Sequence, residues 1–155
     1  MHYFGSKDGL FAEAVSLPID PDELGERVFG PGMEGSGERL VEAFLGIWES
    51  EELGKQVRGV MRAAASNDQA AARLRAFIQA EVLCIPDRFI AQPDGRLRLE
   101  LAATQLVGIA LARYILGVEP LASTPTGVLV RTVGPVIQHY LSGDLGEPAG
   151  REEPS

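Results

Sequence analysis

The chain has 155 residues, 45% of them apolar, which is enough for one domain with a substantial buried core. Its net charge is −8 and no basic stripe runs along it, so any contact with DNA is confined to a small local surface. The single cysteine, Cys84, excludes an internal disulfide and a cysteine-rich zinc site. Neither a membrane-spanning apolar stretch nor a secretory leader is recognisable, and we expect a cytoplasmic protein.

The first predicted helix covers "SKDGLFAEAVSL" at residues 6–17, where Leu10, Phe11, Ala14 and Val15 have helical spacing. Ser6 is a suitable N-cap for it, and Pro18 ends it. The next stretch, residues 18–37, is rich in proline and glycine. It predicts a loop with at most a short helix over 22–29.

Three helices are predicted in the middle of the chain. Ser36 is expected to cap the first, which runs to about residue 50 with one apolar stripe. The second spans about Glu52 to Ala65. Asn67 is expected to cap the third, and Pro86 should bend or break it because proline lacks the N–H and clashes with the preceding turn.

Two further helices follow a turn at residues 93–95. The helix over 96–116 is apolar almost all round from Leu99 onwards, which indicates burial on more than one side. The last helix should be capped by Ser123 or Thr124, with Pro125 as its first residue, and should end at Gly143. Strand patterns are lacking, so the sequence predicts an all-α bundle of six or seven helices and a polar, disordered tail.

Nothing in the sequence indicates an enzyme. The two histidines, His2 and His139, lie far apart, and there is no zinc-protease motif, glycine-rich phosphate loop or serine nucleophile elbow. Cys84 lies in an apolar helix without a basic neighbour in sequence, which favours an inert buried thiol. We therefore expect no catalytic residue, no metal site and no cofactor.

The opening "HYFGSKDGLF" resembles the end of the DNA-binding region of TetR-family transcriptional regulators. The resemblance rests on Tyr3, Phe4, Gly5, Ser6, Lys7 and Leu10, whereas Met1 stands where the family most often has tyrosine. The stretches "FLGIWES", "RAAASNDQAAARLRAFI" and "QLVGIALARYILGVEPLAS" are similar to a C-terminal domain type of the same family. Together the similarity covers about residues 1–143.

The resemblance implies a domain plan and a function. Residues 1–6 would be the remnant of a DNA-recognition helix and its turn, residues 7–143 an effector-binding and dimerisation domain, and residues 144–155 an acidic tail. Most of the helix-turn-helix would be missing from this chain. The implied function is a ligand-responsive transcriptional regulator, and we expect a repressor that a small-molecule effector releases from DNA. A helical, dimeric interaction module without DNA binding is the alternative.

Three N-terminal residues are candidates for DNA contacts. Lys7 is in the first turn of a helix, where a cation is unfavourable unless a phosphate faces that end. His2 and Tyr3 can donate to phosphates or to base edges. The plainer interpretation is that Tyr3 is core and Lys7 is merely solvated.

The resemblance also implies an effector pocket between the middle helices, for a small and largely apolar ligand. Most of our candidates are apolar, with a few polar groups to orient the ligand. Each of them could instead be ordinary core. Arg113 is expected to pair internally with Glu81 or Glu100 rather than to meet an anionic ligand. The candidates are Phe44, Trp48, Val57, Met61, Phe77, Glu81, Cys84, Gln105, Ile109 and Arg113.

The last two helices are expected to form a two-fold dimer interface. Their apolar surface is larger than a monomer usually exposes, although the core of the domain itself could also cover it. The candidate interface residues are Leu101, Gln105, Gly108, Ala112, Ile115, Val128, Val133, Val136, Ile137 and Tyr140.

Overall fold

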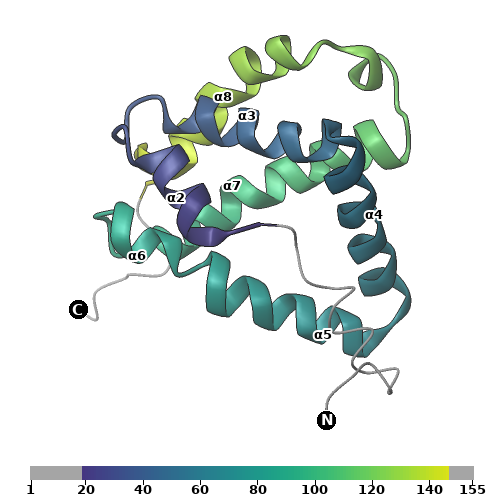
Figure 1. The fold of residues 1–155 in the computed structure, drawn as a ribbon. Helices are drawn as coiled ribbons and strands as arrows, with labels where there is room; N and C mark the ends of the chain where they lie inside the picture. Colours follow the sequence, from purple (N-terminus) through teal and green to yellow (C-terminus); the bar gives the residue numbers. More distant parts are fainter. Residues whose placement is uncertain (1–18, 147–155) are drawn as a thin grey trace, which may run out of the picture.

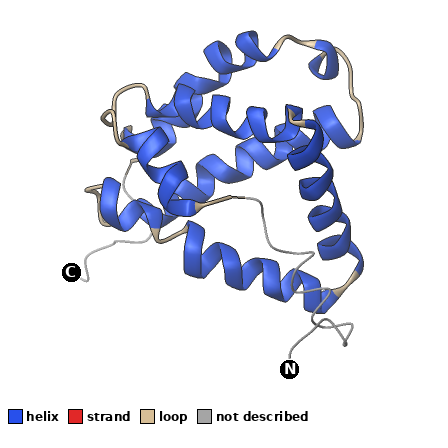
Figure 2. Cartoon of the chain, in the orientation of Figure 1, coloured by secondary structure: helices blue, strands red, loops and turns tan. Residues whose placement is uncertain are grey.

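A computed structural model describes residues 19–146, and within them the chain is helical, without strands (Figure 2). The all-α prediction is confirmed. The first predicted helix, the candidate DNA contacts and residues 147–155 of the tail lie outside the described residues. The helices are α2 (Pro21–Phe29), α3 (Ser36–Glu49), α4 (Glu51–Ser66), α5 (Asp68–Phe77), α6 (Ile85–Phe89), α7 (Gly95–Ala110) and α8 (Thr126–Ser142).

The helices are arranged around a crossing of α3 and α8, with α7 packed alongside both (Figure 1). From the end of α3, α4 runs steeply away, and α5 returns beneath it toward α6 and the start of α7 (Figure 1). The main core lies where α2, α3, α7 and α8 meet. Its fully enclosed side chains include Val28, Val41, Leu106, Ile137 and Leu141.

Side-chain caps start α2, α4 and α5. Asp20 Oδ1 accepts from the backbone N–H of Asp22 at 3.0 Å, and Ser50 Oγ accepts from the N–H of Leu53 at 3.4 Å. Asn67 Oδ1 accepts from the N–H of Ala70 at 3.0 Å, which confirms the predicted cap of α5. The short helix expected over 22–29 is also present as α2.

Two predicted caps are wrong. The residue before α3 is Gly35, and Ser36 is already helical and buried. The amide of Gln138 replaces the expected cap, because its Oε1 accepts from the N–H of Gly37 at 2.8 Å. Pro125 is the residue that precedes α8, so Ser123 and Thr124 lie too early to cap it.

Two π-helical turns extend helices at their C-terminal ends. The first, Ile78–Val82, follows α5, and the chain then restarts as α6 with Pro86 in its first turn, where its missing N–H leaves no helical bond unmade. The predicted break at Pro86 is therefore confirmed. The second turn, Leu111–Ile115, continues α7 to the end of the helix expected over 96–116.

Candidate effector cavity and dimer surface

A partly open apolar cavity lies between α2, α3, α7 and the segment that follows α5. We call it the larger chamber; its volume is about 170 Å³. Val28, Leu40 and Leu106 form its floor from the main core, and Ala103 and Val107 of α7 form one wall. The complete lining is Ile19, Leu24, Gly25, Val28, Phe29, Leu40, Phe44, Ile78, Val82, Ile85, Leu99, Ala103, Leu106 and Val107.

A second cavity of about 120 Å³, the smaller chamber, lies beside the first. Trp48, Val57 and Met61 line it from α3 and α4, together with Ile47 and Leu74. Its remaining wall residues belong to both chambers and are Ile19, Phe44, Ile78 and Val107. Because the two chambers share four wall residues, they form one divided site between the middle helices.

Trp48 connects the smaller chamber to the end of α7. Its ring stacks on Tyr114, with the centroids 5.2 Å apart and the planes 5° from parallel. The phenol of Tyr114 donates to Glu49 Oε1 at 2.8 Å. Burial, and then the hydrogen bond to Glu49, raise the pKa of Tyr114 to about 12.

The opposite side of α7 exposes apolar side chains to solvent. Leu97, Leu111, Ile115 and Leu116 lie on α7 and its π-helical continuation, and Val136 lies on the neighbouring α8. Leu116 is the most exposed of them, at 66%. Gly108 lies among them, and a Cβ built on it would meet nothing within 4 Å. These exposed residues of α7, its continuation and α8 include candidates for the predicted dimer interface, so we call this surface the dimer face.

The model of the tetracyclin repressor-like C-terminal domain matches residues 34–141. A solved TetR-family regulator from Streptomyces coelicolor A3 is similar at 31% sequence identity and a TM-score of 0.59, over 90% of this chain and 73% of that one. Comparison with curated proteins returns no match. The chain belongs to the TetR family. It is a regulator domain of a family that is not enzymatic.

In this TetR-family domain, four of the predicted pocket residues line the cavity: Phe44, Trp48, Val57 and Met61. The other six do not. Phe77 and Ile109 are half-buried outside both chambers, and Gln105 is exposed on the dimer side of α7. For Gln105 and Ile109 the reason is geometric, because α7 has Ala103 and Val107 on the side that lines the cavity, and these two positions lie on other sides of the helix.

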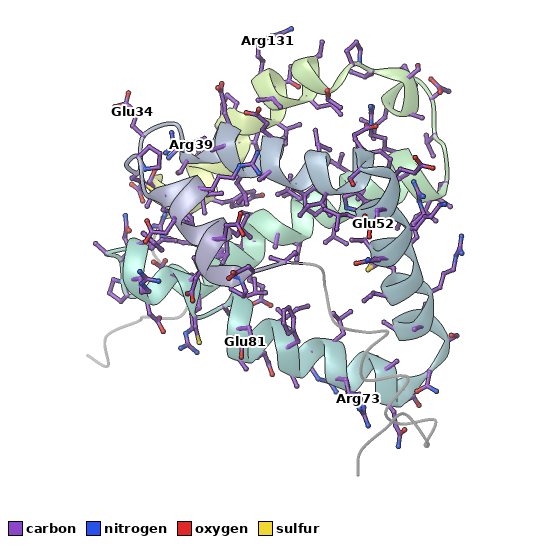
Figure 3. All side chains as sticks on the ribbon, in the orientation of Figure 1. Glu34, Arg39, Glu52, Arg73, Glu81 and Arg131 are labelled. Atoms are coloured by element: carbon purple, nitrogen blue, oxygen red, sulfur yellow. The ribbon has the colours of Figure 1, made fainter. Side chains whose placement is uncertain are left out.

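Glu81 and Cys84 lie on an outer groove of about 150 Å³ with Asp22 and Arg88, not on the cavity. Figure 3 shows Glu81 at the surface of the segment after α5, where it is exposed. The Cys84 thiol donates to the carbonyl of Ala80 at 3.0 Å. It was expected in an apolar surrounding, but Arg96 approaches its Sγ to 3.9 Å.

Arg113 has an internal partner, but not one of those predicted. Its Nη2 lies 3.3 Å from Glu49 Oε1, whereas Glu81 and Glu100 are exposed elsewhere. Its Nη1 donates to the carbonyls of Leu121 at 2.7 Å and Thr124 at 2.6 Å. The side chain is only 8% exposed and holds the loop after α7 in place, and it does not line either chamber.

The predicted dimer residues divide into three groups. Gln105, Gly108, Ile115 and Val136 are exposed. The half-buried residues are Leu101, Ala112, Val128, Val133 and Tyr140, of which the last two pack against the main core. Ile137 is an incorrect assignment, because it is 0% exposed and points into the core between α3 and α8.

Several cavity residues were not predicted, among them Ile19, Val82, Ala103 and Val107. Ile19 lies in the stretch predicted as a loop, and a cavity wall uses the same residue types as a packed core, so helical spacing did not distinguish the other three. The described residues contain no group of three or more potential metal ligands. No helix over residues 19–146 has the length and apolar character to cross a membrane.

Proposed function

We propose that this domain is the effector-binding and dimerisation part of a cytoplasmic, ligand-responsive transcriptional regulator. The observation that carries the proposal is the divided apolar cavity between the middle helices of a TetR-family domain. A concave site that is lined by apolar side chains suits a small apolar ligand.

Dimerisation would occur through α7 and α8. The dimer face gathers exposed leucine, isoleucine and valine side chains on two adjacent helices. Gly108 and Ala112, four residues apart, would let a partner helix approach closely. The same surface on a second copy would then complete an isologous four-helix interface.

The effector would act on DNA through the N-terminal segment. Ile19 lines both chambers, and residues 10–15 precede it directly in the chain. An effector that favours one position of this segment would move the DNA-reading heads of the full-length dimer relative to each other. His2, Tyr3 and Lys7 would contact operator DNA. The coupling free energy between effector binding and DNA binding would equal the difference in effector binding free energy between the two positions of the segment.

The full-length protein tests this proposal. Selection from a random pool of duplex DNA should yield a preferred operator, and a compound that raises the thermal unfolding temperature should release the protein from it. Replacement of Trp48 by alanine should weaken that release without changing DNA affinity in the absence of the compound. A protein with no preferred DNA sequence would instead be a helical interaction module, and the regulator proposal would fail.

A further inference from the structure

The walls of the divided cavity contain no charged side chain among the described residues, and Trp48 is the one hydrogen-bonding side chain among them. The larger chamber is lined by aliphatic side chains, phenylalanine and one glycine. In the smaller chamber the only heteroatoms on side chains are the indole nitrogen of Trp48 and the thioether of Met61. A ligand inside therefore exchanges its water for an apolar surface that offers almost no polar compensation.

Three charged side chains of α3, of α7 and of its continuation are engaged with other protein groups. Glu49 accepts from Tyr114 and pairs with Arg113, whose Nη1 is bound to two loop carbonyls. Arg98 of α7 donates to the carbonyls of Tyr140 and Gly143 at 3.2 and 2.8 Å, at the end of α8. In Figure 3 the labelled Glu34 and Arg131 project from the periphery. An anionic or cationic ligand would meet no counter-charge among the described residues that line the two chambers.

The shape of the cavity favours a long ligand over a round one. Two chambers of about 170 and 120 Å³ share the wall formed by Ile19, Phe44, Ile78 and Val107. An apolar chamber of roughly 150 Å³ holds one benzene molecule. By that measure the two chambers together accommodate on the order of ten carbon atoms, and the shared wall divides them into two parts.

We propose that the effector is an uncharged, elongated, hydrocarbon-like molecule of about ten carbons that occupies both chambers without a charged anchor. That the ligand is an effector rests on the proposed function, whereas its binding to the cavity does not depend on that function. It differs from our sequence-based expectation, in which Glu81, Gln105 and Arg113 would orient the ligand. A polar group on such a molecule has to remain at the opening of the cavity.

The test compares two ten-carbon probes that differ mainly in charge, 1-decanol and decanoate. Trp48 is the only tryptophan of the chain and lines the smaller chamber, so its fluorescence reports occupancy directly. Titration at neutral pH, with thermal unfolding as a second readout, should show 1-decanol binding more tightly than decanoate by about tenfold or more. Equal affinities, or tighter binding of decanoate, would overturn the proposal.

Two variants locate the binding. Ala103→Leu extends a wall residue of the larger chamber into it, and we expect at least a tenfold loss of 1-decanol affinity with an unchanged or raised unfolding temperature. Ala72→Leu on the exposed face of α5 makes the same chemical change away from the cavity and should bind like wild type. If the two variants bind 1-decanol equally, the ligand is not in this cavity.

A third variant adds the missing anchor. Met61 is half-buried at the smaller chamber, so Met61→Lys can place its ammonium at the edge of the site. Its affinity for decanoate should rise relative to that for 1-decanol, and an unchanged ratio would contradict the proposed location. No binding of either probe to the folded wild-type protein would mean that the chain itself fills the chambers. Binding of 1-decanol without release of operator DNA would refute the regulator proposal alone.

Discussion

Tyr114 is a half-buried residue whose phenol has a raised pKa. It lies between the indole of Trp48 and the carboxylate of Glu49, and its phenol proton is held by Glu49 Oε1 at 2.8 Å. Tyr114→Phe keeps the stacked ring and removes that hydrogen bond. We expect a loss of about 1.5 kcal/mol in the free energy of unfolding, typical of a hydrogen bond to a charged group. Urea denaturation measures this free energy, and an unchanged midpoint would contradict a stabilising hydrogen bond between Tyr114 and Glu49.

The same variant tests the raised pKa of Tyr114. Its pKa rises from 10.0 to about 12, so between these values the folded protein keeps a phenol proton that the unfolded chain has lost. The corresponding stability is fully present below pH 10 and disappears as the pH rises to 12. Between pH 10 and pH 12, wild type should therefore lose more stability than Tyr114→Phe. Parallel curves for the two proteins would contradict the shift.

Gln138 caps a helix to which it does not belong. Its Oε1 accepts from the N–H of Gly37, and its Nε2 donates to the carbonyl of Met33 at 3.0 Å. Gln138→Ala leaves both groups unpaired in a half-buried position, and we expect about 1–3 kcal/mol of destabilisation. Gln56→Ala on the exposed face of α4 is the matched control and should change the unfolding temperature little. Equal effects of the two changes would contradict the capping role.

Residue-scale prediction from sequence succeeded where the partner is local. Asn67 and Pro86 act within one turn of their own position, and both were identified from the sequence. The start of α3 depends on Gln138, 101 residues away from Gly37, and no local pattern carries that information. Arg113 illustrates the same limit, because its need for a partner could be predicted but the position of Glu49 could not.

At the scale of the elements, the crossing of α3 and α8 depends on two glycines. A Cβ on Gly37 would lie 2.6 Å from the backbone nitrogen of Gln138, and a Cβ on Gly134 would lie 3.2 Å from Cα of Glu38. The two helices therefore approach until their backbones are nearly in contact. Since α7 packs on both, this crossing fixes the floor of the effector cavity.

Gly37→Ala should separate these helices. The new methyl group has to displace backbone rather than a flexible side chain, and we expect about 1–3 kcal/mol of destabilisation. Gly46→Ala in the same helix adds a methyl group where nothing lies within 4 Å. It should stabilise by about 0.5–1 kcal/mol through helix propensity. Thermal unfolding compares the two, and a Gly37→Ala protein as stable as Gly46→Ala would contradict the close crossing.

The helices themselves were readable from apolar spacing, whereas their mutual placement was not. Val107 and Gly108 are neighbours in one predicted helix, yet one lines the cavity and the other lies on the dimer face. Periodicity assigns residues to sides of a helix but does not say what each side meets. For that reason Phe44 and Trp48 could be placed at the cavity, while Gln105 was assigned to a wall that it does not reach.

On the scale of the whole molecule, α7 separates the two proposed binding surfaces. Ala103 and Val107 contact the cavity on one side, and Leu101 and Gly108 lie toward the dimer face on the other. One helix thickness therefore lies between effector and partner subunit. A ligand that shifts α7 would change the dimer interface as well as the N-terminal segment, and dimer affinity should depend on effector concentration.

The dimer face can be tested without disturbing the core. Gly108→Arg places a long charged side chain on α7 where a Cβ meets nothing within 4 Å, so the protomer should fold normally. In an isologous interface the change occurs twice near the two-fold axis, and the two guanidinium groups would be desolvated without partners. We expect the dissociation constant of the dimer to rise by 100-fold or more, which corresponds to about 3 kcal/mol.

Gly59→Arg provides the control for this experiment. Gly59 is exposed within α4, away from the dimer face, and its Cβ position is equally open, so the change in charge and helix propensity is the same. Sedimentation velocity at micromolar concentration should find Gly59→Arg dimeric and Gly108→Arg monomeric, with similar helical circular dichroism. If both variants sediment like wild type, the interface lies elsewhere. If wild type is itself a monomer, the exposed apolar side chains of α7 and α8 need another partner.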